Sequence, residues 1–134
     1  MRFVPAILAA AVLAVLGLGW WEKMDVATTR YATLQEAHAA GAFQRGWLPP
    51  YLPESTRTIT ETNDLDRNLG AGSFEFSPAD YPAFVANYTP ASAEVAARWR
   101  EHTAKGCAIF AHSENGTRWI LALHPDGKGI YRVE

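Results

Sequence analysis

The sequence contains a single cysteine, Cys107, among its 134 residues. A lone thiol excludes an intramolecular disulfide, so the folded part of the chain must be held together by its core alone. It also argues against a lipid-modified cysteine near the N-terminus, because Cys107 lies far from that end of the chain. Stability must therefore come from packing and hydrogen bonding.

A basic excess is also missing. Twelve Lys and Arg stand against 14 Asp and Glu, which gives a net charge of −2, and both signs are scattered along the chain. Proteins that bind nucleic acid usually carry a basic patch or stripe. No nucleic-acid partner is therefore expected.

Charged side chains are absent from residues 3–21, a run rich in Ala, Val, Leu and Gly. A helix of this length rises about 28 Å, close to the thickness of a bilayer core. Arg2 precedes the run, so the positive-inside rule leaves the N-terminus in the cytoplasm. We predict a transmembrane anchor or signal peptide over residues 1–23 and a single exported domain over residues 24–134.

The flanks of the apolar run favour an anchor that is retained. The small-x-small cleavage motif at Gly17 and Gly19 would place the cut before Trp20 and Trp21. Tryptophan rings suit the headgroup region of a bilayer better than a new N-terminus. A single-pass anchor is the first prediction, and cleavage with release is the alternative.

The exported part is expected to form an α+β domain, with an antiparallel sheet of about five strands and two or three helices on one face. A polar spacer over residues 24–30 and an extended, buried, proline-rich segment over residues 46–53 complete this picture. The capping box of Thr33 and Glu36 predicts a short first helix. Two further helices are expected at 80–87 and 92–104, and strands at 57–62, 73–77, 107–113, 118–124 and 130–133.

Asn115 and Gly116 form the strongest short hairpin signal in the chain, because a type I′ turn needs positive φ at both central residues. If they are the two loop residues, the register of the flanking strands follows directly. The predicted opposed pairs include Phe110–Leu121, Ala111–Ile120, His112–Trp119 and Cys107–His124.

The loop after the predicted strand at 57–62 contains Asp64, Asp66 and Asn68. These residues have the spacing of positions 1, 3 and 5 of a calcium-binding loop. Glu75 falls at position 12, where an EF-hand places its bidentate carboxylate. However, Leu69 occupies the position that requires glycine. We therefore predict a turn shaped by side chains that accept backbone hydrogen bonds, with a Ca²⁺ or Mg²⁺ site at these four residues as the alternative.

Other sets of residues that could form a catalytic or zinc site give only weak signals in the sequence. Cys107 and His124 could pair as a nucleophile and its base, but a buried free cysteine beside a histidine is the more common arrangement. The four histidines, His38, His102, His112 and His124, do not have the spacing of a zinc site. A catalytic role and a zinc site are therefore not favoured, and the possible cofactor is Ca²⁺ or Mg²⁺.

About a quarter of the chain resembles a set of uncharacterised small exported bacterial proteins. The residues that carry this resemblance are Gly46-Trp47-Leu48-Pro49, Leu52-Pro53-Glu54-Ser55, Ile59, Asp64-Leu65-Asp66-Arg67-Asn68 and Ser73-Phe74-Glu75-Phe76. The resemblance implies a shared exported domain in bacteria, but it brings no activity and no functional residue with it.

The sequence thus leads to two functional hypotheses. The first is a non-catalytic interaction module, held in the bacterial inner membrane by residues 3–21, whose exported domain binds another envelope component such as a protein. Release into the periplasm after cleavage is its variant. The second is a divalent-metal-binding domain or a metal-dependent hydrolase that uses the loop over residues 64–68.

Overall fold

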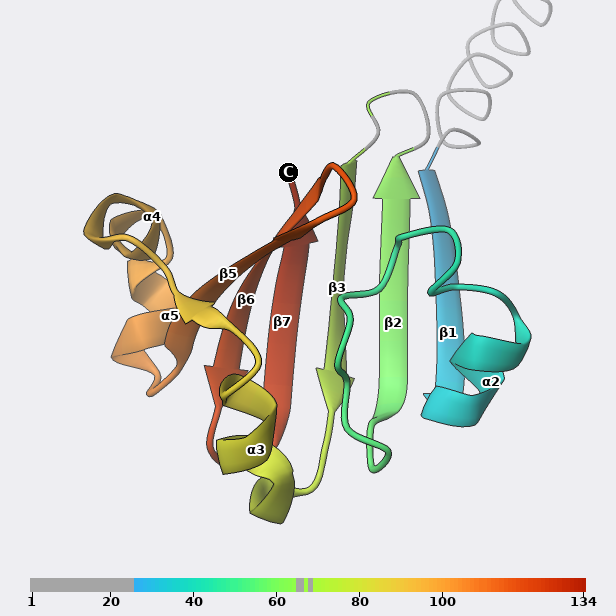
Figure 1. The fold of residues 1–134 in the computed structure, drawn as a ribbon, viewed down its shortest axis with the longest axis horizontal. Helices are drawn as coiled ribbons and strands as arrows, with labels where there is room; N and C mark the ends of the chain where they lie inside the picture. Colours follow the sequence, from blue (N-terminus) through green and yellow to red (C-terminus); the bar gives the residue numbers. More distant parts are fainter. Residues whose placement is uncertain (1–25, 65–66, 68) are drawn as a thin grey trace, which may run out of the picture.

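The computed structural model describes residues 26–64, 67 and 69–134, which form one antiparallel sheet of seven strands in the order β1-β2-β3-β7-β6-β5-β4 (Figure 1). Its strands are β1 (Val26–Thr33), β2 (Arg57–Asp64), β3 (Leu69–Glu75), β4 (Thr89–Pro90), β5 (Ala108–Glu114), β6 (Thr117–His124) and β7 (Lys128–Val133). The predicted anchor over residues 3–21 lies outside the described residues. Within the described ranges, no helix is long and apolar enough to cross a bilayer.

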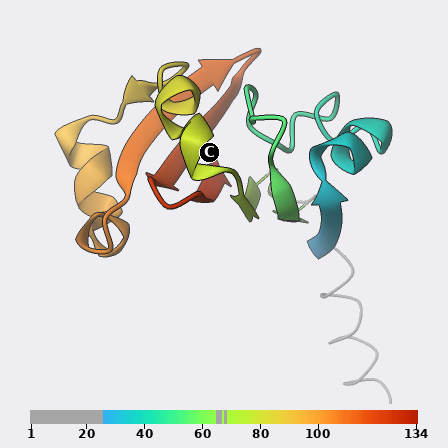
Figure 2. The same cartoon turned by 90° about the horizontal axis from the view of Figure 1, so that it is seen from below.

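Short helices cover both faces of the sheet, so the prediction of one covered face is wrong (Figure 2). They are α2 (Leu34–Ala39), α3 (Tyr81–Val85), α4 (Ala93–Arg98) and α5 (Arg100–Ala104), with a 3₁₀ turn, η1 (Pro78–Asp80), before α3. The inner face, as we name it, carries a core that includes Leu34, Phe84, Phe110 and Leu121. The outer face carries a separate core of Val95, Trp99, Ile109, Ile120 and Ala122. Adjacent residues of β5 and β6 point to opposite faces, so both faces of this hairpin are buried.

The sheet has seven strands rather than about five, because it also contains β1 and the two-residue β4, which pairs with β5. Residues 24–30 were expected to be a polar spacer, yet Val26 begins β1, which pairs antiparallel with β2. Leu69 begins β3 four residues earlier than the predicted strand at 73. The sequence pattern did not predict a strand at residues 69–72, because Gly70 and Gly72 have a low intrinsic preference for strands.

The hairpin prediction is confirmed in register. Phe110 pairs with Leu121, Ala111 with Ile120 and His112 with Trp119. Asn115 and Gly116 both have positive φ, 50° and 79°, as a type I′ turn requires. The ladder between these strands ends at Ala108, one residue short of the predicted pair Cys107–His124.

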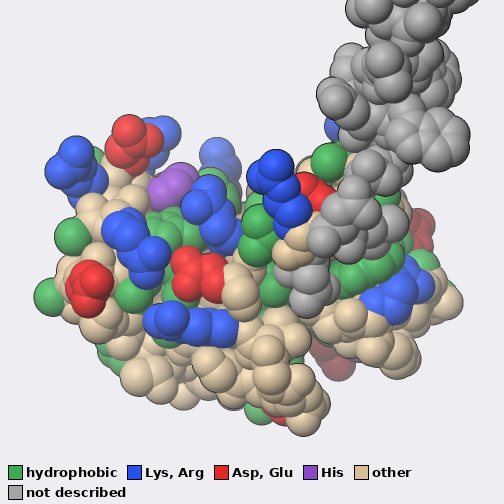
Figure 3. All heavy atoms as spheres, turned by 90° about the horizontal axis from the view of Figure 1, so that it is seen from above, with side chains coloured by type: hydrophobic (Ala, Val, Ile, Leu, Met, Phe, Trp, Pro, Cys, Tyr) green, Lys and Arg blue, Asp and Glu red, His purple; other side chains and the backbone are tan. Residues whose placement is uncertain are grey.

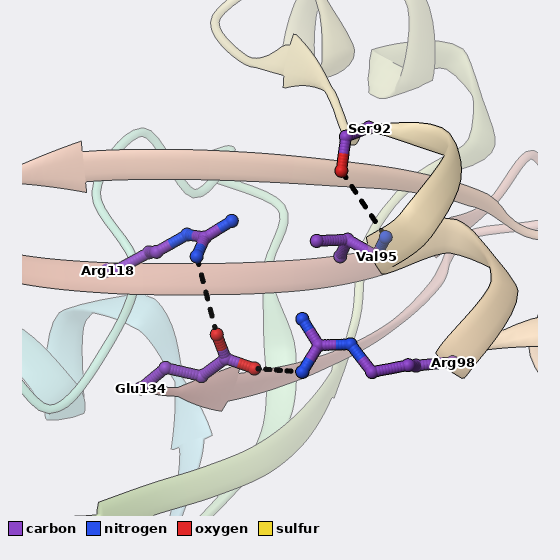
Figure 4. Close-up of polar contacts among 5 residues, drawn as sticks. All are labelled: Ser92, Val95, Arg98, Arg118 and Glu134. Carbon is purple, nitrogen blue, oxygen red and sulfur yellow. Dashed lines mark hydrogen bonds and ion pairs between the residues drawn. The ribbon is translucent and has the colours of Figure 1, made fainter.

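Local capping signals place the helix starts. The Thr33 hydroxyl accepts a hydrogen bond from the Glu36 amide at 3.2 Å, and the Glu36 carboxylate reaches back to the Ala32 amide at 2.8 Å. Ser92 caps α4 in the same way through the Val95 amide, at 3.3 Å (Figure 4).

The predicted helix over residues 92–104 is interrupted at Trp99. There the backbone leaves the helical region, with φ −110° and ψ 20°, and separates α4 from α5. Trp99 is itself buried in the outer core, where it packs with Val95. The periodicity of the sequence predicted the buried face of this segment, but it carried no signal for the break.

The proline-rich segment lies across the inner face without regular structure and is largely buried, as predicted, but it is not extended throughout: Tyr51 lies in a turn with φ 69° and is 50% exposed. Leu48 is 1% exposed and Leu52 is 9% exposed, and Pro49 is also fully buried. The Tyr88 hydroxyl donates a hydrogen bond to the Pro50 carbonyl, which attaches the segment to the region after α3.

Glycines in the two central strands make room for aromatic rings on the inner face. A Cβ on Gly72 of β3 would lie 2.6 Å from the Tyr131 hydroxyl and would also collide with the Thr60 carbonyl. A Cβ on Gly129 of β7 would collide with the Phe74 ring. The rings of Phe74 and Tyr131 therefore lie flat over neighbouring strands, in space that only glycine leaves open.

We expect the substitution Gly72→Ala to reduce the free energy of unfolding by about 3 kcal/mol or more, because the new methyl group meets backbone as well as a buried ring. Ser73→Ala, at the next and exposed position of the same strand, should change it by no more than about 0.5 kcal/mol. Chemical denaturation of the two variants measures both values. Equal stability of Gly72→Ala and wild type would contradict the packing described for Tyr131.

Candidate functional site

The predicted metal loop begins at the end of β2. The Asp64 carboxylate accepts a hydrogen bond from the Arg67 amide at 3.2 Å, and its second oxygen lies 3.7 Å from the Arg67 side chain. This is the contact expected of an aspartate that shapes a turn. The other two predicted ligands, Asp66 and Asn68, lie outside the described residues.

Glu75 is not brought to this loop. In the register of β2 and β3, Asp64 pairs with Leu69 at one end of the ladder and Glu75 pairs with Arg57 at the other. Six residues of strand separate the two ends by about 20 Å. Glu75 instead forms a half-exposed ion pair with Arg57 at 3.6 Å. No cluster of three metal-ligating side chains is found among the residues that the structure describes.

Cys107 and His124 do not form a nucleophile and its base. The Nδ1 atom of His124 accepts a hydrogen bond from the Asp126 amide at 3.0 Å, and Nε2 lies 3.1 Å from the Lys105 carbonyl. Both ring nitrogens are therefore engaged. Burial raises the pKa of the Cys107 thiol, which disfavours the reactive thiolate.

A buried carboxylate lies on the inner face of β2. Glu61 is 0% exposed and occupies a cross-strand row with Gly72 of β3 and Tyr131 of β7. The Tyr31 hydroxyl of β1 donates a hydrogen bond to Glu61 Oε1 at 2.8 Å. Within the described ranges, Glu61 Oε2 and the Tyr131 hydroxyl have no hydrogen-bond partner.

Burial dominates the electrostatics of this group. It raises the pKa of the Glu61 carboxyl above the ordinary value, while the hydrogen bond from Tyr31 and the charge of Arg45 act in the opposite direction. Burial, followed by the charge of Glu61, raises the pKa of Tyr131. Because Glu61 is enclosed, it cannot contact a substrate, and its charged form is costly.

An open cleft lies at the end of the sheet where β1 begins. It has a volume of about 320 Å³ and lies between the loop after α2, the ends of β2 and β3, and the turn of the β5–β6 hairpin. An adjoining hollow of about 370 Å³ shares Arg45 and Thr117 with it and extends to Trp119. We call the two together the end cleft; its principal side chains are Arg45, Trp47, Asn63, Asp64, Thr117 and Trp119.

Two N–H donors in the end cleft are buried without a partner in the described part of the protein. They are Nδ2 of Asn63 and Nε1 of Trp119, each on a residue that is 4% exposed. The register places both residues in one row on the inner face, with Gly70 and Val133 between them. Buried donors normally have acceptors, so this row is incomplete within the described protein.

The charges of the end cleft are unevenly compensated. Asp64 pairs with Arg67, and the Glu134 carboxylate at the edge of the cleft lies 3.9 Å from Arg98 and 3.6 Å from Arg118 (Figure 4). The Arg45 guanidinium instead lies 4.4 Å above the Trp47 ring and donates to the Ala40 carbonyl at 2.7 Å. Within the described ranges Arg45 forms no ion pair with a carboxylate, although its charge acts on the buried Glu61. The cleft is also bordered by the Glu114 carboxylate, which lies 3.5 Å from His112.

Sequence reasoning missed Glu61 and Asn63, although a signal was present. Ile59, Glu61 and Asn63 alternate along one strand, so the apolar Ile59 indicates that its two polar neighbours share its buried face. Arg45 and Trp47 carry no comparable signal, because they follow a helix and lie in an irregular loop.

We expect the stability of the protein to fall as the pH rises through the raised pKa of Glu61. The folded state holds this proton more tightly than the unfolded chain, so its stabilising effect is complete at pH values below the ordinary carboxyl pKa and is lost above the raised one. Glu61→Gln keeps an acceptor for Tyr31 and removes the buried charge. Above neutral pH it should therefore be more stable than wild type by about 1–3 kcal/mol.

Thermal unfolding of both proteins between pH 4 and pH 8 measures this difference. Glu75→Gln is the matched control, because Glu75 is half-exposed and its ion pair is worth no more than about 1 kcal/mol. A pH profile that is the same for Glu61→Gln and wild type would show that the carboxylate is not buried as described.

One comparison with known proteins gives a match. The family model of the YbbD head domain matches residues 25–75, which is less than half of the chain and includes β1, α2, β2 and β3. No curated protein and no solved structure matches. The match fits the resemblance to an uncharacterised bacterial protein family, but it does not test the individual motifs. Over residues 25–75 the chain is therefore similar to the YbbD head domain, a family of unknown or non-catalytic role.

Proposed function

We propose that the protein is a non-catalytic binding module of the bacterial envelope, anchored in the inner membrane by residues 3–21, and that it binds another envelope component in the end cleft. The observation that carries this proposal is the end cleft itself, an open space that Arg45 and Thr117 border in both of its parts. A volume of about 300–1,000 Å³ with a few convergent polar groups is typical of ligand sites.

The position of the end cleft agrees with a tether. Val26 pairs with Asp64, a cleft residue, so the chain enters the sheet at this end (Figure 1). Only four residues separate residue 21 from residue 26, and they can span at most about 14 Å. A domain held by residues 3–21 would therefore keep the end cleft close to the membrane surface. Release after cleavage would remove this constraint.

The potentially reactive side chains of the domain are buried or already hydrogen-bonded, which supports binding rather than catalysis. Glu61 is enclosed, both ring nitrogens of His124 are occupied, and the raised pKa of Cys107 disfavours its thiolate. None of these three groups has the access and activation that a nucleophile or a general base requires.

We expect site-directed photo-cross-linking in intact cells to capture the bound envelope component. A benzophenone amino acid at Glu114, which is exposed and borders the end cleft, should give adducts with another molecule. The same probe at Asp126, which is exposed at the opposite end of the hairpin strands, is the control and should give none. Recovery of the protein alone from both positions would contradict the proposal.

The second hypothesis from the sequence, a metal site at Asp64, Asp66 and Asn68, leads to a separate measurement. Because Asp64 already accepts from the Arg67 amide, we expect millimolar Ca²⁺ or Mg²⁺ to leave the thermal midpoint of the full chain unchanged. A rise in the midpoint that chelation reverses, and that Asp64→Asn abolishes, would instead establish the loop as a metal site and revive the metal-dependent alternative.

A further inference from the structure

The two edges of the sheet differ in how they are protected. β4 ends the sheet on one side with only two residues, Thr89 and Pro90, and proline has no backbone N–H to offer a further strand. β1 ends it on the other side with eight residues, Val26–Thr33, which include neither proline nor lysine. Short strands, prolines and lysines are the usual means of blocking an edge, because an open edge pairs with other chains. The β1 edge lacks all three.

The free side of β1 is a row of backbone groups without partners. In an antiparallel ladder alternate residues direct both N–H and C=O to the same neighbour, so about half of these groups in β1 point away from β2. Within the described part of the chain, β1 pairs with β2 alone, and no loop or helix forms a backbone–backbone hydrogen bond to it. Such a row is satisfied by another extended backbone, so the edge fits a strand.

Neighbouring elements and charges leave room for an added strand. The buried residues of α2, Leu34 and Ala37, pack into the inner core, and Figure 2 shows this helix, in cyan, on the inner side of β1. Arg30 is the one charged residue of β1, and five of its eight residues are exposed. Figure 3, which looks onto the end of the sheet where β1 begins, shows hydrophobic and basic side chains at that margin.

The side chains of β1 are complementary to a second β1 strand that runs antiparallel to the first. If Thr29 lies opposite itself on a two-fold axis, Tyr31 lies opposite Ala27 and Arg30 lies opposite Thr28. Each large side chain then faces a smaller one, and the pairing extends over most of the strand. About six backbone hydrogen bonds would close the open row.

The neighbouring symmetric registers are less favourable. A register centred on Arg30 would place two like charges directly opposite each other, which destabilises a strand pair. A register centred on Thr28 would leave Tyr31 and the end of the described strand without a described partner residue. The register centred on Thr29 avoids both defects.

We propose that β1 pairs with β1 of a second copy of this chain, antiparallel and with Thr29 on the two-fold axis, so that the two sheets join into one. The inference goes beyond the proposed function, because it uses the β1 edge instead of the end cleft. It also agrees with a tether. The two Val26 residues would lie about 20 Å apart at opposite ends of the paired strands. With the two-fold axis normal to the bilayer, both copies can be anchored in the same membrane.

Cysteine cross-linking of the full chain in bacterial membranes tests the pairing. In a Cys107→Ala background, Thr29→Cys should form an interchain disulfide under mild oxidation, because directly opposed Cβ atoms lie about 4.5–5.5 Å apart. Thr28→Cys is the matched control, since its Cα lies about 8 Å from its counterpart in this register, beyond the reach of a disulfide. We expect at least tenfold more disulfide-linked dimer from Thr29→Cys on a non-reducing gel.

A charge variant tests the same edge without oxidation. Thr29→Lys would oppose two like charges on the axis, so it should convert the full chain in an uncharged detergent from dimer to monomer, as measured by sedimentation. Ser73→Lys is the matched control, because Ser73 is exposed on β3, away from the edge, and it should leave the dimer intact. Equal thermal midpoints of the two variants establish that misfolding does not explain the difference.

Several outcomes would overturn the inference. A wild-type chain that sediments as a monomer, or a dimer that Thr29→Lys leaves intact, would remove the second copy from this edge. Equal cross-linking of the two cysteine variants would indicate random collision. A disulfide from Thr29→Cys to a different protein would assign the edge to an extended segment of that protein. The end cleft is tested separately by capture from Glu114, so either proposal can fail while the other stands.

Discussion

The inner face of the sheet depends on the absence of Cβ atoms at its centre. Gly72 and Gly129 lie in the adjacent strands β3 and β7, where Tyr131 and Phe74 lie flat across them. A side chain at Gly72 would displace both a buried ring and a strand carbonyl. The position of Tyr131 next to Glu61, and with it the shape of the core beneath the proline-rich segment, follows from this steric constraint.

The buried carboxylate of Glu61 lies close to the end cleft, because the two occupy neighbouring inner-face positions of β2. Glu61 and Asn63 are two residues apart on β2 and share the inner face, and Arg45 acts on the pKa of Glu61 while bordering the cleft. The charge of a ligand next to Arg45 would therefore also be felt by Glu61, since interactions are poorly screened where water is excluded.

Prediction succeeded where short-range rules decide the structure. The register of the β5–β6 hairpin follows from the Asn115–Gly116 turn, and the start of α2 follows from the capping box of Thr33 and Glu36. It failed at β1, at β4, at the first residues of β3 and at the break at Trp99. These segments have weak local preferences, and contacts with residues distant in sequence decide their structure.

The sequence by itself determined the hairpin pairing, the start of the first helix at its capping box and the turn chemistry of Asp64, because each depends on neighbours within a few residues. Only the tertiary structure decided that Glu61 is enclosed and that Glu75 lies far from Asp64. It also brought Arg45, Asn63 and Trp119 to one end of the sheet. That meeting requires the strand order β2-β3-β7-β6, in which strands distant in sequence become neighbours, and no local pattern specifies such an order.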